Sequence, residues 1–311
     1  MREWLPEVSV VMSVYNGGRA LEASLFSILG QSDVDLEFVV VDDGSTDGSS
    51  DLLDGVARGD SRLRVVRQAN AGLTQALARG CDMARSEFIA RQDVGDISKR
   101  ERLSRQLACI REHPEAAFVS CGTRFVGPMG ETLYEVVRSE GGAQERLLTL
   151  DLAKFAGPSS HPSTLFRRSL YEDVGGYRGA FYFGQDIDLW IRLAERGRHV
   201  VMQDILYQAS ITVGSLSSAN RTQQFECARL IMECTRARRS GESEAEFLAE
   251  ASLVRPNREK GLNRLGRARS LYFIGECLRQ RNDPDAKRYF LEALSVFPLH
   301  LRSLARLMIP S

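Results

Sequence analysis

The sequence lacks several features that would place it quickly in a class of protein. Its 311 residues contain no apolar run approaching the roughly 20 residues that a membrane span needs. Lysine plus arginine and aspartate plus glutamate both number 41, so no excess of one charge favours nucleic acid or an anionic surface. The six cysteines are scattered without a CxxC pair, which is typical of small core residues in a reducing cytoplasm.

Two further absences narrow the choice. The first residues, MREWLPEVSVVM, lack the basic segment and long apolar segment of a signal peptide. No GxGxxG follows the first expected strand, which argues against a dinucleotide-binding oxidoreductase. We therefore expect a cytoplasmic protein, at most peripheral to a membrane, with one large domain and an appendage.

Strand and helix patterns alternate along the N-terminal part of the chain. The expected strands cover residues 8–14, 36–41, 63–67 and 88–90, and the expected helices cover 18–30, 49–58 and 73–84. Because such alternation builds right-handed βαβ units, we predict an α/β fold with a mostly parallel sheet. Beyond it we expect a strand at 117–126, a polar hairpin or loop at 127–142, a turn-rich segment at 157–163, an amphipathic helix at 185–196, and helices from about residue 219.

Two of the expected strands end in acidic turns. Asp42 and Asp43 end the second strand, and Asp93 and Asp96 follow the fourth. The carboxyl ends of parallel strands meet at one edge of a sheet, where open α/β folds bind ligands. The carboxylates therefore predict a ligand site, although each pair could instead cap the following helix, which for the second pair would begin at Ser98.

Short motifs then occur in a fixed order along the chain. They are VVMSVYN at 10–16, VDDGSTD at 41–47, NAGL at 70–73, ARQDVGD at 90–96, HPS at 161–163, GGY at 175–177, and QD at 185–186 leading into LWIRL at 189–193. Each is weak alone. Together, over roughly residues 6–216, the chain resembles a family-2 glycosyltransferase with the GT-A nucleotide-sugar-binding fold. The resemblance implies a GT-A domain at residues 1–218 and a helical C-terminal region at 219–311.

The resemblance also implies a site for a nucleoside-diphosphate sugar. In this family an Asp-x-Asp-Asp run contacts the ribose and a divalent metal, which assigns Asp93 to the nucleotide and Asp96 to Mg²⁺ or Mn²⁺. Such cations prefer hard oxygen ligands and can neutralise a leaving diphosphate. Gly95 stands at the third position of the run, so one expected carboxylate is missing.

Further nucleotide contacts are implied in the same way. The residues implied to bind the nucleotide are Val14, Tyr15, Asn16, Asp42, Asp43, Gly72, Arg91, Asp93 and His161. The first three would lie against the pyrimidine. Either Asp42 or Asp43 would accept a hydrogen bond from the base, and the choice between them is open. Tyr15 could equally be an ordinary strand-end aromatic. Arg91 could pair with a carboxylate or reach the diphosphate, and His161, in a loop, could be structural.

Sugar transfer needs a general base, because an acceptor hydroxyl is a poor nucleophile until it loses its proton. In the family this base is the Asp of a Glu-Asp pair at a helix start, which matches Asp186 and implies one in-line displacement with inversion. Asp188 is a competing candidate, and Asp186 could simply favour the first turn of its helix. Gln185 replaces the family's Glu, and Gln208 replaces the arginine of a Tyr-Arg pair.

The C-terminal third resembles part of a tetratricopeptide unit from residue 264 onward, with its second helix matching better than its first. One such unit cannot bury its apolar face alone. We expect it to pack on the catalytic domain or on a second subunit, as in a homodimer. Basic residues outnumber acidic ones there, so this tail could touch a membrane surface, or it could be a solvated helical face.

The sequence thus predicts an inverting, metal-dependent glycosyltransferase. Its donor would be a nucleoside-diphosphate sugar, with a UDP-sugar as first choice and dTDP- or GDP-sugars open, and its acceptor a saccharide or lipid-linked saccharide in surface-glycan synthesis. The departures at Gly95, Gln185 and Gln208 leave two alternatives. One is a nucleotide-sugar-binding protein without activity, and the other is a scaffold that uses the helical tail.

Overall fold

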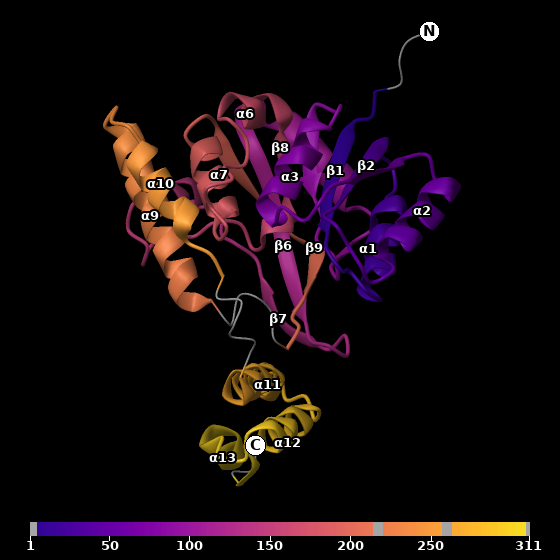
Figure 1. Ribbon diagram of the computed structural model, residues 1–311, viewed down its shortest axis with the longest axis vertical. Helices are drawn as coiled ribbons and strands as arrows, with labels where there is room; N and C mark the ends of the chain where they lie inside the picture. Colours follow the sequence, from indigo (N-terminus) through magenta and orange to yellow (C-terminus); the bar gives the residue numbers. More distant parts are fainter. Residues whose placement is uncertain (1–4, 214–219, 257–262, 309–311) are drawn as a thin grey trace. The chain divides into compact units, whose positions relative to one another are not determined.

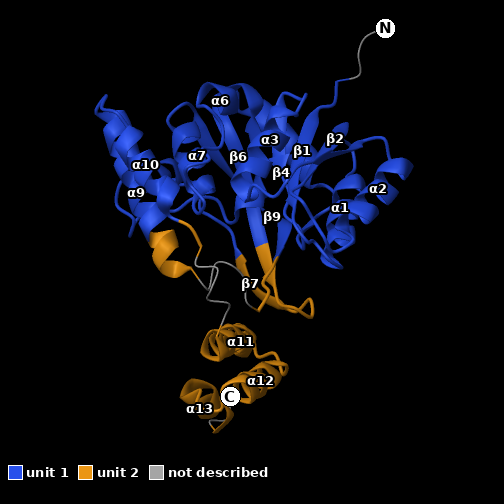
Figure 2. Ribbon diagram, viewed as in Figure 1, with its two compact units in different colours: residues 1–123, 136–209, 226–254 blue, residues 124–135, 210–225, 255–311 orange. Residues whose placement is uncertain are grey.

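The structure is a computed structural model that describes residues 5–213, 220–256 and 263–308 (Figure 1). Contacts divide the chain into two compact units (Figure 2). The first unit contains Met1–Thr123, Val136–Ala209 and Glu226–Val254, and the second contains Arg124–Glu135, Ser210–Phe225 and Arg255–Ser311. The expected domain boundary at residues 218 and 219 lies outside the described residues and stays a prediction.

The N-terminal strands form the parallel part of the sheet. They are β1 (Val8–Val14), β2 (Leu36–Asp42), β3 (Leu63–Arg67) and β4 (Phe88–Arg91). They pair in the order β3-β2-β1-β4, with every pair parallel. The connecting helices are α1 (Ala20–Leu29), α2 (Ser49–Gly59) and α3 (Leu73–Asp82). The predicted α/β alternation is confirmed, and the carboxyl ends of β1, β2 and β4 lie at the same edge of the sheet.

Later strands extend the sheet with antiparallel pairs. They are β5 (Ile97–Ser98), β6 (Ala116–Val126), β7 (Thr132–Val136), β8 (Thr164–Arg167) and β9 (Arg198–Ser210). In the described chain the order is β3-β2-β1-β4-β8-β6-β9-β5, with β7 paired to β6. β8 is antiparallel to β4 and β6, and β5 is antiparallel to β9. The helix considered from Ser98 is wrong, because Ser98 pairs with Tyr207 of β9 and α4 (Arg102–Glu112) begins later.

Helices cover both faces of the parallel strands (Figure 1). Val10 and Met12 of β1 pack with apolar residues of α1, α2 and α4, whereas Val11 packs toward α3 and α7 (Gln185–Ala194). A strand covered on both faces needs an uninterrupted apolar run, which explains the composition of β1 and β2. The other helical segments of the first unit are α5 (Ala143–Leu148), the 3₁₀ turn η1 (His161–Ser163), α6 (Arg168–Asp173), most of α9 (Arg221–Arg239) and α10 (Ala245–Leu253).

The second unit has a hydrophobic core of its own. Its helices are α11 (Arg264–Gln280), α12 (Ala286–Val296) and α13 (Leu301–Met308). Ile274 and Phe290 are buried in this core together with Leu133 of the β6–β7 hairpin. Gly275 allows close packing of α11 on α12, because a Cβ there would lie 2.6 Å from the Phe290 ring. Of the helices that the structure describes, none is long and apolar enough to cross a membrane.

Candidate functional site

The loop that follows β1 is tied to the loop that follows β2. Asn16 has a left-handed backbone with φ of 54°. Its side-chain oxygen accepts from the Thr46 N–H at 2.8 Å, and its own N–H donates to the Ser45 hydroxyl at 3.0 Å. Val14 is fully buried in β1, whereas Tyr15 is 55% exposed. Held in this way, Tyr15 presents a ring that is available for stacking on a base.

Asp42 is buried at the end of β2, and both of its carboxylate oxygens are engaged. One accepts from the Ser45 N–H at 3.0 Å, and the other accepts from the Ser50 hydroxyl. Burial alone would raise the pKa of Asp42, but the bonds from Ser50 and Ser45 lower it below the usual range. Asp42 is therefore an ionised carboxylate that shapes the turn into α2.

Asp43 connects the end of β2 to the start of α3. Its carboxylate accepts from the Gln68 side-chain amide at 2.7 Å and from the backbone N–H groups of Ala71 and Gly72 at 2.8 and 2.9 Å. Gly72 has φ of 89°, a conformation that favours glycine. Asp43 thus positions the Ala71–Gly72 turn, where Gly72 itself presents only backbone to an approaching ligand.

Arg91, Asp93, Asp96 and Tyr207 are linked at the end of β4. Arg91 is fully buried and donates to the Asp93 carboxylate at 2.5 Å. The Arg91 Nε and Nη1 atoms have no hydrogen-bond partner in the described part of the chain. The Tyr207 hydroxyl donates to the buried Asp96 carboxylate at 2.9 Å and accepts from the Asp93 N–H at 3.3 Å. One tyrosine of β9 therefore holds the two carboxylate-bearing residues of the turn in register.

Arg102 of α4 contacts both Tyr207 and the backbone of Arg91. Its guanidinium lies 4.9 Å from the centre of the Tyr207 ring and donates to the carbonyls of Arg91 and Pro162 at 3.0 and 2.6 Å. It is fully buried. Neither Arg102 nor Tyr207 received a functional role from the sequence. The only signal was Tyr207 itself, the first residue of the pair in which Gln208 replaces the family's arginine.

Asp186 lies in the first turn of α7, close enough to Arg91 and Asp93 to interact with their charges. Burial raises the pKa of Asp186 above its usual range, and the N–H of Ile187 and the charge of Arg91 oppose that rise only in part. A carboxylate with a raised pKa and incomplete pairing is suited to accept a proton.

Asp188, two residues further along α7, has different surroundings. It is buried, and Arg178 and Arg192 both bind its carboxylate, Arg192 at 2.6 Å. Although burial alone would raise the pKa of Asp188, the two guanidinium groups hold it below the usual range. Its oxygens are committed to ion pairs, so the geometry disfavours Asp188 as the competing base.

His161 packs between two aromatic side chains. Its Nε2 lies 2.7 Å from the Tyr177 hydroxyl, and its ring meets Trp190 edge-on with centroids 5.5 Å apart. Burial, together with the nearby charge of Arg91, lowers the pKa of His161 well below 6.5, so the imidazole is neutral at pH 7. His161 thus lies close enough to Arg91 to be affected by its charge, and its own contacts are with Tyr177 and Trp190.

The donor set bears on whether a metal fits here. Among the described residues there is no group of three or more His, Cys, Asp or Glu side chains that could hold a metal ion. Mg²⁺ in nucleotide sites usually takes one or two carboxylates and completes its shell with phosphate oxygens and water. Asp93 and Asp96, two carboxylates at a strand end, fit that arrangement. They do not form a cage that would bind a metal without the nucleotide.

The predicted site residues fall into two neighbouring groups. The first, at the loops after β1 and β2 and the start of α3, contains Val14, Tyr15, Asn16, Asp42, Asp43 and Gly72. The second, around Arg91, contains Asp93, Asp96, His161 and Asp186. Both belong to the edge where β1, β2 and β4 end. The position is the one where open α/β sheets bind ligands.

Comparison with known proteins decides the family. The model of the family described as "Glycosyl transferase family 2" matches residues 9–175. The chain belongs to glycosyl transferase family 2. EpsE of Bacillus subtilis (strain 168), a glycosyltransferase by name, is 30% identical over 238 residues, which cover 74% of this chain and 82% of EpsE. The chain is therefore a glycosyltransferase, as its motifs predict.

Other similarities are more distant. Chondroitin synthase of Pasteurella multocida is 22% identical over 223 residues, which cover 71% of this glycosyltransferase but 22% of the synthase. The crystal structure of S. aureus TarS (residues 1–349) in complex with UDP-GlcNAc has a TM-score of 0.55 at 19% identity and covers 91% of this chain and 83% of that one. The mannosyltransferase PcManGT from Pyrobaculum calidifontis, in complex with GDP-Man and Mn²⁺, has a TM-score of 0.57 at 19% identity, with 96% and 82% covered. At these identities the likeness concerns the fold, and it confirms the predicted GT-A class.

Proposed function

We propose that this glycosyltransferase moves a sugar from a nucleoside-diphosphate sugar to a hydroxyl of a saccharide or lipid-linked saccharide, with inversion, during surface-glycan synthesis. The observation that carries the proposal is that Asp186, from a distant part of the chain, lies within reach of the charges of Arg91 and Asp93, while Tyr207 links Asp93 to Asp96. A UDP-sugar is the first candidate donor, because a structural neighbour is a complex with UDP-GlcNAc. A GDP-sugar is the second, from the complex with GDP-Man.

Asp186 is proposed as the general base. Its raised pKa and partial pairing support this role, and the engagement of Asp188 by two guanidinium groups weighs against the competing candidate. Asp186 takes the proton from the acceptor hydroxyl as that oxygen attacks the anomeric carbon, and the nucleoside diphosphate leaves from the opposite face. A single displacement of this kind inverts the anomeric configuration.

Asp96 is proposed to hold a divalent metal, and Asp93 to contact the nucleotide. The chemistry that such a metal supplies is neutralisation of the charge that develops on the leaving diphosphate. Tyr207 orients the Asp96 carboxylate by a hydrogen bond, and Arg91 fixes the Asp93 carboxylate. Tyr15 and the Ala71–Gly72 turn are proposed to receive the base and the adjoining part of the nucleotide.

A panel of nucleotides tests the donor site. We would measure the thermal stabilisation produced by UDP, dTDP, GDP and CDP, each with and without Mn²⁺, in the wild type, in Asp96→Ala and in the matched control Asp51→Ala. Asp51 is an exposed aspartate of α2. We expect one nucleotide to stabilise the wild type and the control when Mn²⁺ is present, and that stabilisation to be lost in Asp96→Ala.

A turnover assay then separates the remaining alternatives. The release of nucleoside diphosphate from UDP-GlcNAc and GDP-mannose is measured, and NMR of any product gives its anomeric configuration. Nucleotide binding without turnover would favour a nucleotide-sugar-binding protein. No stabilisation by any nucleotide would contradict the proposed donor site and favour a scaffold that uses the C-terminal helices.

A further inference from the structure

α13 carries two adjacent stripes of side chains, and only one is buried. Ser303 is fully buried, and Leu307 packs against the core of the second unit. Leu304 and Met308 directly follow these two residues in the chain, and with Leu301 they form the other stripe; Leu301, Leu304 and Met308 are 71%, 43% and 75% exposed. Spacings of three and four residues place these three side chains on one face of the helix. The apolar stripe therefore faces outward from the core of its own unit.

A groove of about 690 Å³ lies beside the N-terminal end of α13. Its lining includes the exposed Leu299 and Leu301 together with Arg269 and Arg302. Within the described part of the chain, neither arginine has an ion-pair partner. The acidic residue of the lining, Glu276, is already paired with two other arginines. The groove thus combines apolar surface with uncompensated positive charge.

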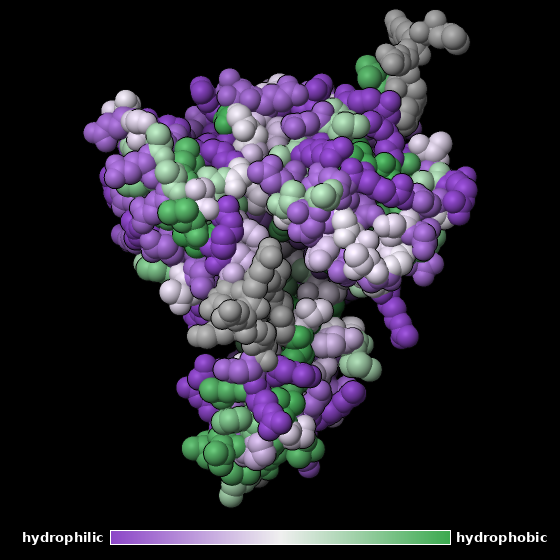
Figure 3. Space-filling view, in the orientation of Figure 1, coloured by the Kyte–Doolittle hydropathy of each residue, from purple (hydrophilic) through white to green (hydrophobic). Residues whose placement is uncertain are grey.

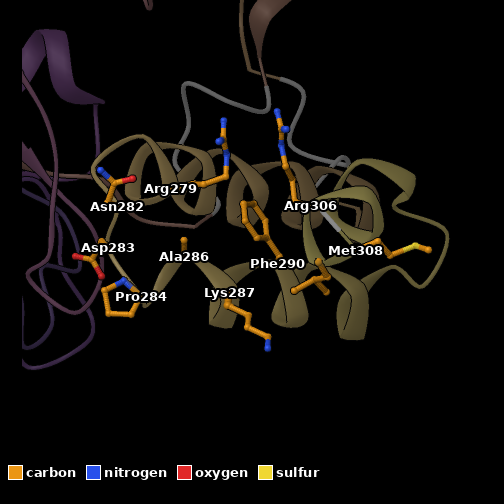
Figure 4. A pocket seen from close by; sticks show the side chains of 10 residues that line it. Arg279, Asn282, Asp283, Pro284, Ala286, Lys287, Phe290, Arg306 and Met308 are labelled. Carbon is orange, nitrogen blue, oxygen red and sulfur yellow. The ribbon is translucent and has the colours of Figure 1, made fainter. Parts of the chain in front are cut away.

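A second hollow, of about 610 Å³, lies beside the C-terminal end of α13 (Figure 4). Phe290 and Met308 supply apolar surface, and Arg279, Lys287 and Arg306 are the basic residues of the lining. Arg279 and Arg306 share Glu276 as an ion-pair partner, and Asp283 also lines the hollow. Figure 4 shows the Arg279 and Arg306 side chains pointing to one side and Lys287 to the other. The same combination of apolar and basic groups therefore occurs at both ends of this short helix.

The charge of this segment differs from that of the whole chain. Residues 263–308 contain nine basic and four acidic side chains, whereas the full sequence is balanced at 41 of each sign. Hydrophobic surface over the same C-terminal helices is visible in Figure 3. A second copy of the chain would bring two basic faces together across a symmetric interface and repel. An anionic surface with an apolar layer beneath it complements both properties.

We propose that the α13 face, defined as Leu299, Leu301, Arg302, Leu304 and Met308 with the two hollows beside it, docks on an anionic lipid membrane. The leucines and the methionine enter the boundary between headgroups and acyl chains, and the arginines contact lipid phosphates. These are the two components that bind an interfacial amphipathic helix to a membrane. The inference does not depend on which donor or acceptor the enzyme uses.

Co-sedimentation of the full chain with vesicles tests the proposal. The vesicles are phosphatidylcholine alone or phosphatidylcholine mixed with phosphatidylglycerol. We expect sedimentation with the mixed vesicles, weak or no sedimentation with phosphatidylcholine alone, and release at high salt, because salt screens the arginines. The same experiment with soluble glycerol phosphate as competitor distinguishes a lipid surface from a free phosphate, which is expected not to displace the protein.

Variants with matched controls identify the surface. The double variant Leu301→Ser/Leu304→Ser is expected to bind about ten-fold or more weakly, through loss of buried apolar area. Arg302→Glu is expected to bind about ten-fold more weakly, through reversal of one charge at the membrane. Leu291→Ser and Arg288→Glu make the same chemical changes at exposed positions of α12 that line neither hollow, and they are expected to leave binding nearly unchanged.

Three results would overturn the proposal. The first is no sedimentation of the wild type with mixed vesicles. The second is equal weakening by the control variants, which would mean binding by overall charge. The third is concentration-dependent self-association in solution that is lost in Leu301→Ser/Leu304→Ser, which would assign the face to a second copy. Because the substituted leucines are exposed, circular dichroism is expected to show the variants folded.

Discussion

At the scale of single residues, Asp186 and Asp188 have the same side chain and opposite surroundings. Burial tends to raise the pKa of both carboxyl groups, but only the charge of Asp188 is compensated by two guanidinium groups. A carboxylate without full compensation has a raised pKa, and one with full compensation has a lowered pKa. The first can exchange a proton near neutral pH more readily, and the second stabilises the fold.

Substitution of each aspartate by asparagine separates these roles. Asp186→Asn is expected to lower kcat by about 100-fold or more and to leave the free energy of unfolding at neutral pH unchanged or higher, because burial disfavours the charged form. Asp188→Asn leaves Arg178 and Arg192 without their shared carboxylate and is expected to cost about 3–5 kcal/mol. Initial rates and urea denaturation measure the two effects. Equal losses of stability in both variants would contradict the assignment.

Asp186 and Asp188 are expected to make the transfer rate and the stability, respectively, depend on pH. The proposed mechanism requires ionised Asp186, so the rate is expected to fall as the pH decreases through a pKa above the ordinary value of about 3.9. The lowered pKa of Asp188 contributes stability that is present above its unfolded pKa and is lost as the pH falls through its folded pKa. The acid limb of activity should therefore lie at higher pH than acid unfolding, as rates and circular dichroism would show. An acid limb that coincides with unfolding would argue against Asp186 as the base.

Tyr207 offers a separate prediction at this scale. Tyr207→Phe removes the hydrogen bond to Asp96 and is expected to weaken Mn²⁺ binding in the nucleotide complex about ten-fold. The Mn²⁺ concentration that gives half of the nucleotide-induced thermal stabilisation measures this effect. Tyr134→Phe, which removes a hydroxyl from the second unit, is the control. An unchanged Mn²⁺ requirement in Tyr207→Phe would mean that the hydroxyl does not orient Asp96.

At the scale of elements, the turn between β4 and β5 explains one departure from the family pattern. Gly95 has φ of 89°, and its N–H donates to the Ser24 hydroxyl of α1 at 2.8 Å. An added Cβ would meet Ala20 at an ordinary 3.8 Å, so the obstacle to a side chain is backbone conformation and not space. The missing carboxylate thus accompanies a turn shape that favours glycine.

Restoring the carboxylate is expected to strain this turn. Gly95→Asp and the matched variant Gly95→Ala should each lower the free energy of unfolding by about 1–2 kcal/mol, because both place a Cβ on a left-handed backbone. Gly95→Asp should also show no more activity than Gly95→Ala. Urea denaturation and turnover measure the two quantities. A Gly95→Asp variant as stable as the wild type, or more active than it, would show that the turn accepts the family residue.

At the scale of the whole molecule, the two compact units have separate hydrophobic cores. Phe290 lies in the core of the second unit, and Leu77 lies in one of the cores of the first. Trp190 is buried in one of the cores of the first unit, whereas Trp4 lies outside the described residues. In a Trp4→Phe background, tryptophan fluorescence therefore reports on the first unit, whereas circular dichroism reports on both.

Truncations of core side chains in the two units are expected to shift different unfolding transitions. Phe290→Ala should destabilise the second unit by about 3–5 kcal/mol and separate the circular dichroism transition from the fluorescence transition. Leu77→Ala should instead move the fluorescence transition to lower urea. Both probes are followed in the same titrations. Coincident transitions in the wild type and in both variants would mean that the two units unfold as one.

Much of the first unit could be predicted from local pattern. The alternation of strands and helices in residues 8–91 was predicted correctly. A strand buried on both faces needs a continuous apolar run, and each connecting helix shows the helical spacing of apolar residues. Parallel pairing then brings Asp42 and Arg91 to one edge, so the neighbourhood of the candidate site followed from the order of elements. The roles of the individual site residues stay predictions.

The sequence by itself determined the strand–helix alternation, the acidic strand ends and the family motifs, because each depends on residues close together in the chain. Only the tertiary structure decided that Asp188 is neutralised by Arg178 and Arg192, that Tyr207 bridges Asp93 and Asp96, and that α13 turns an apolar stripe outward. Tyr207 lies more than one hundred residues from Asp96 along the chain. Its hydroxyl reaches the carboxylate because β9 pairs with β5, and a side chain's partners and burial depend on such long-range pairing, which no local pattern encodes.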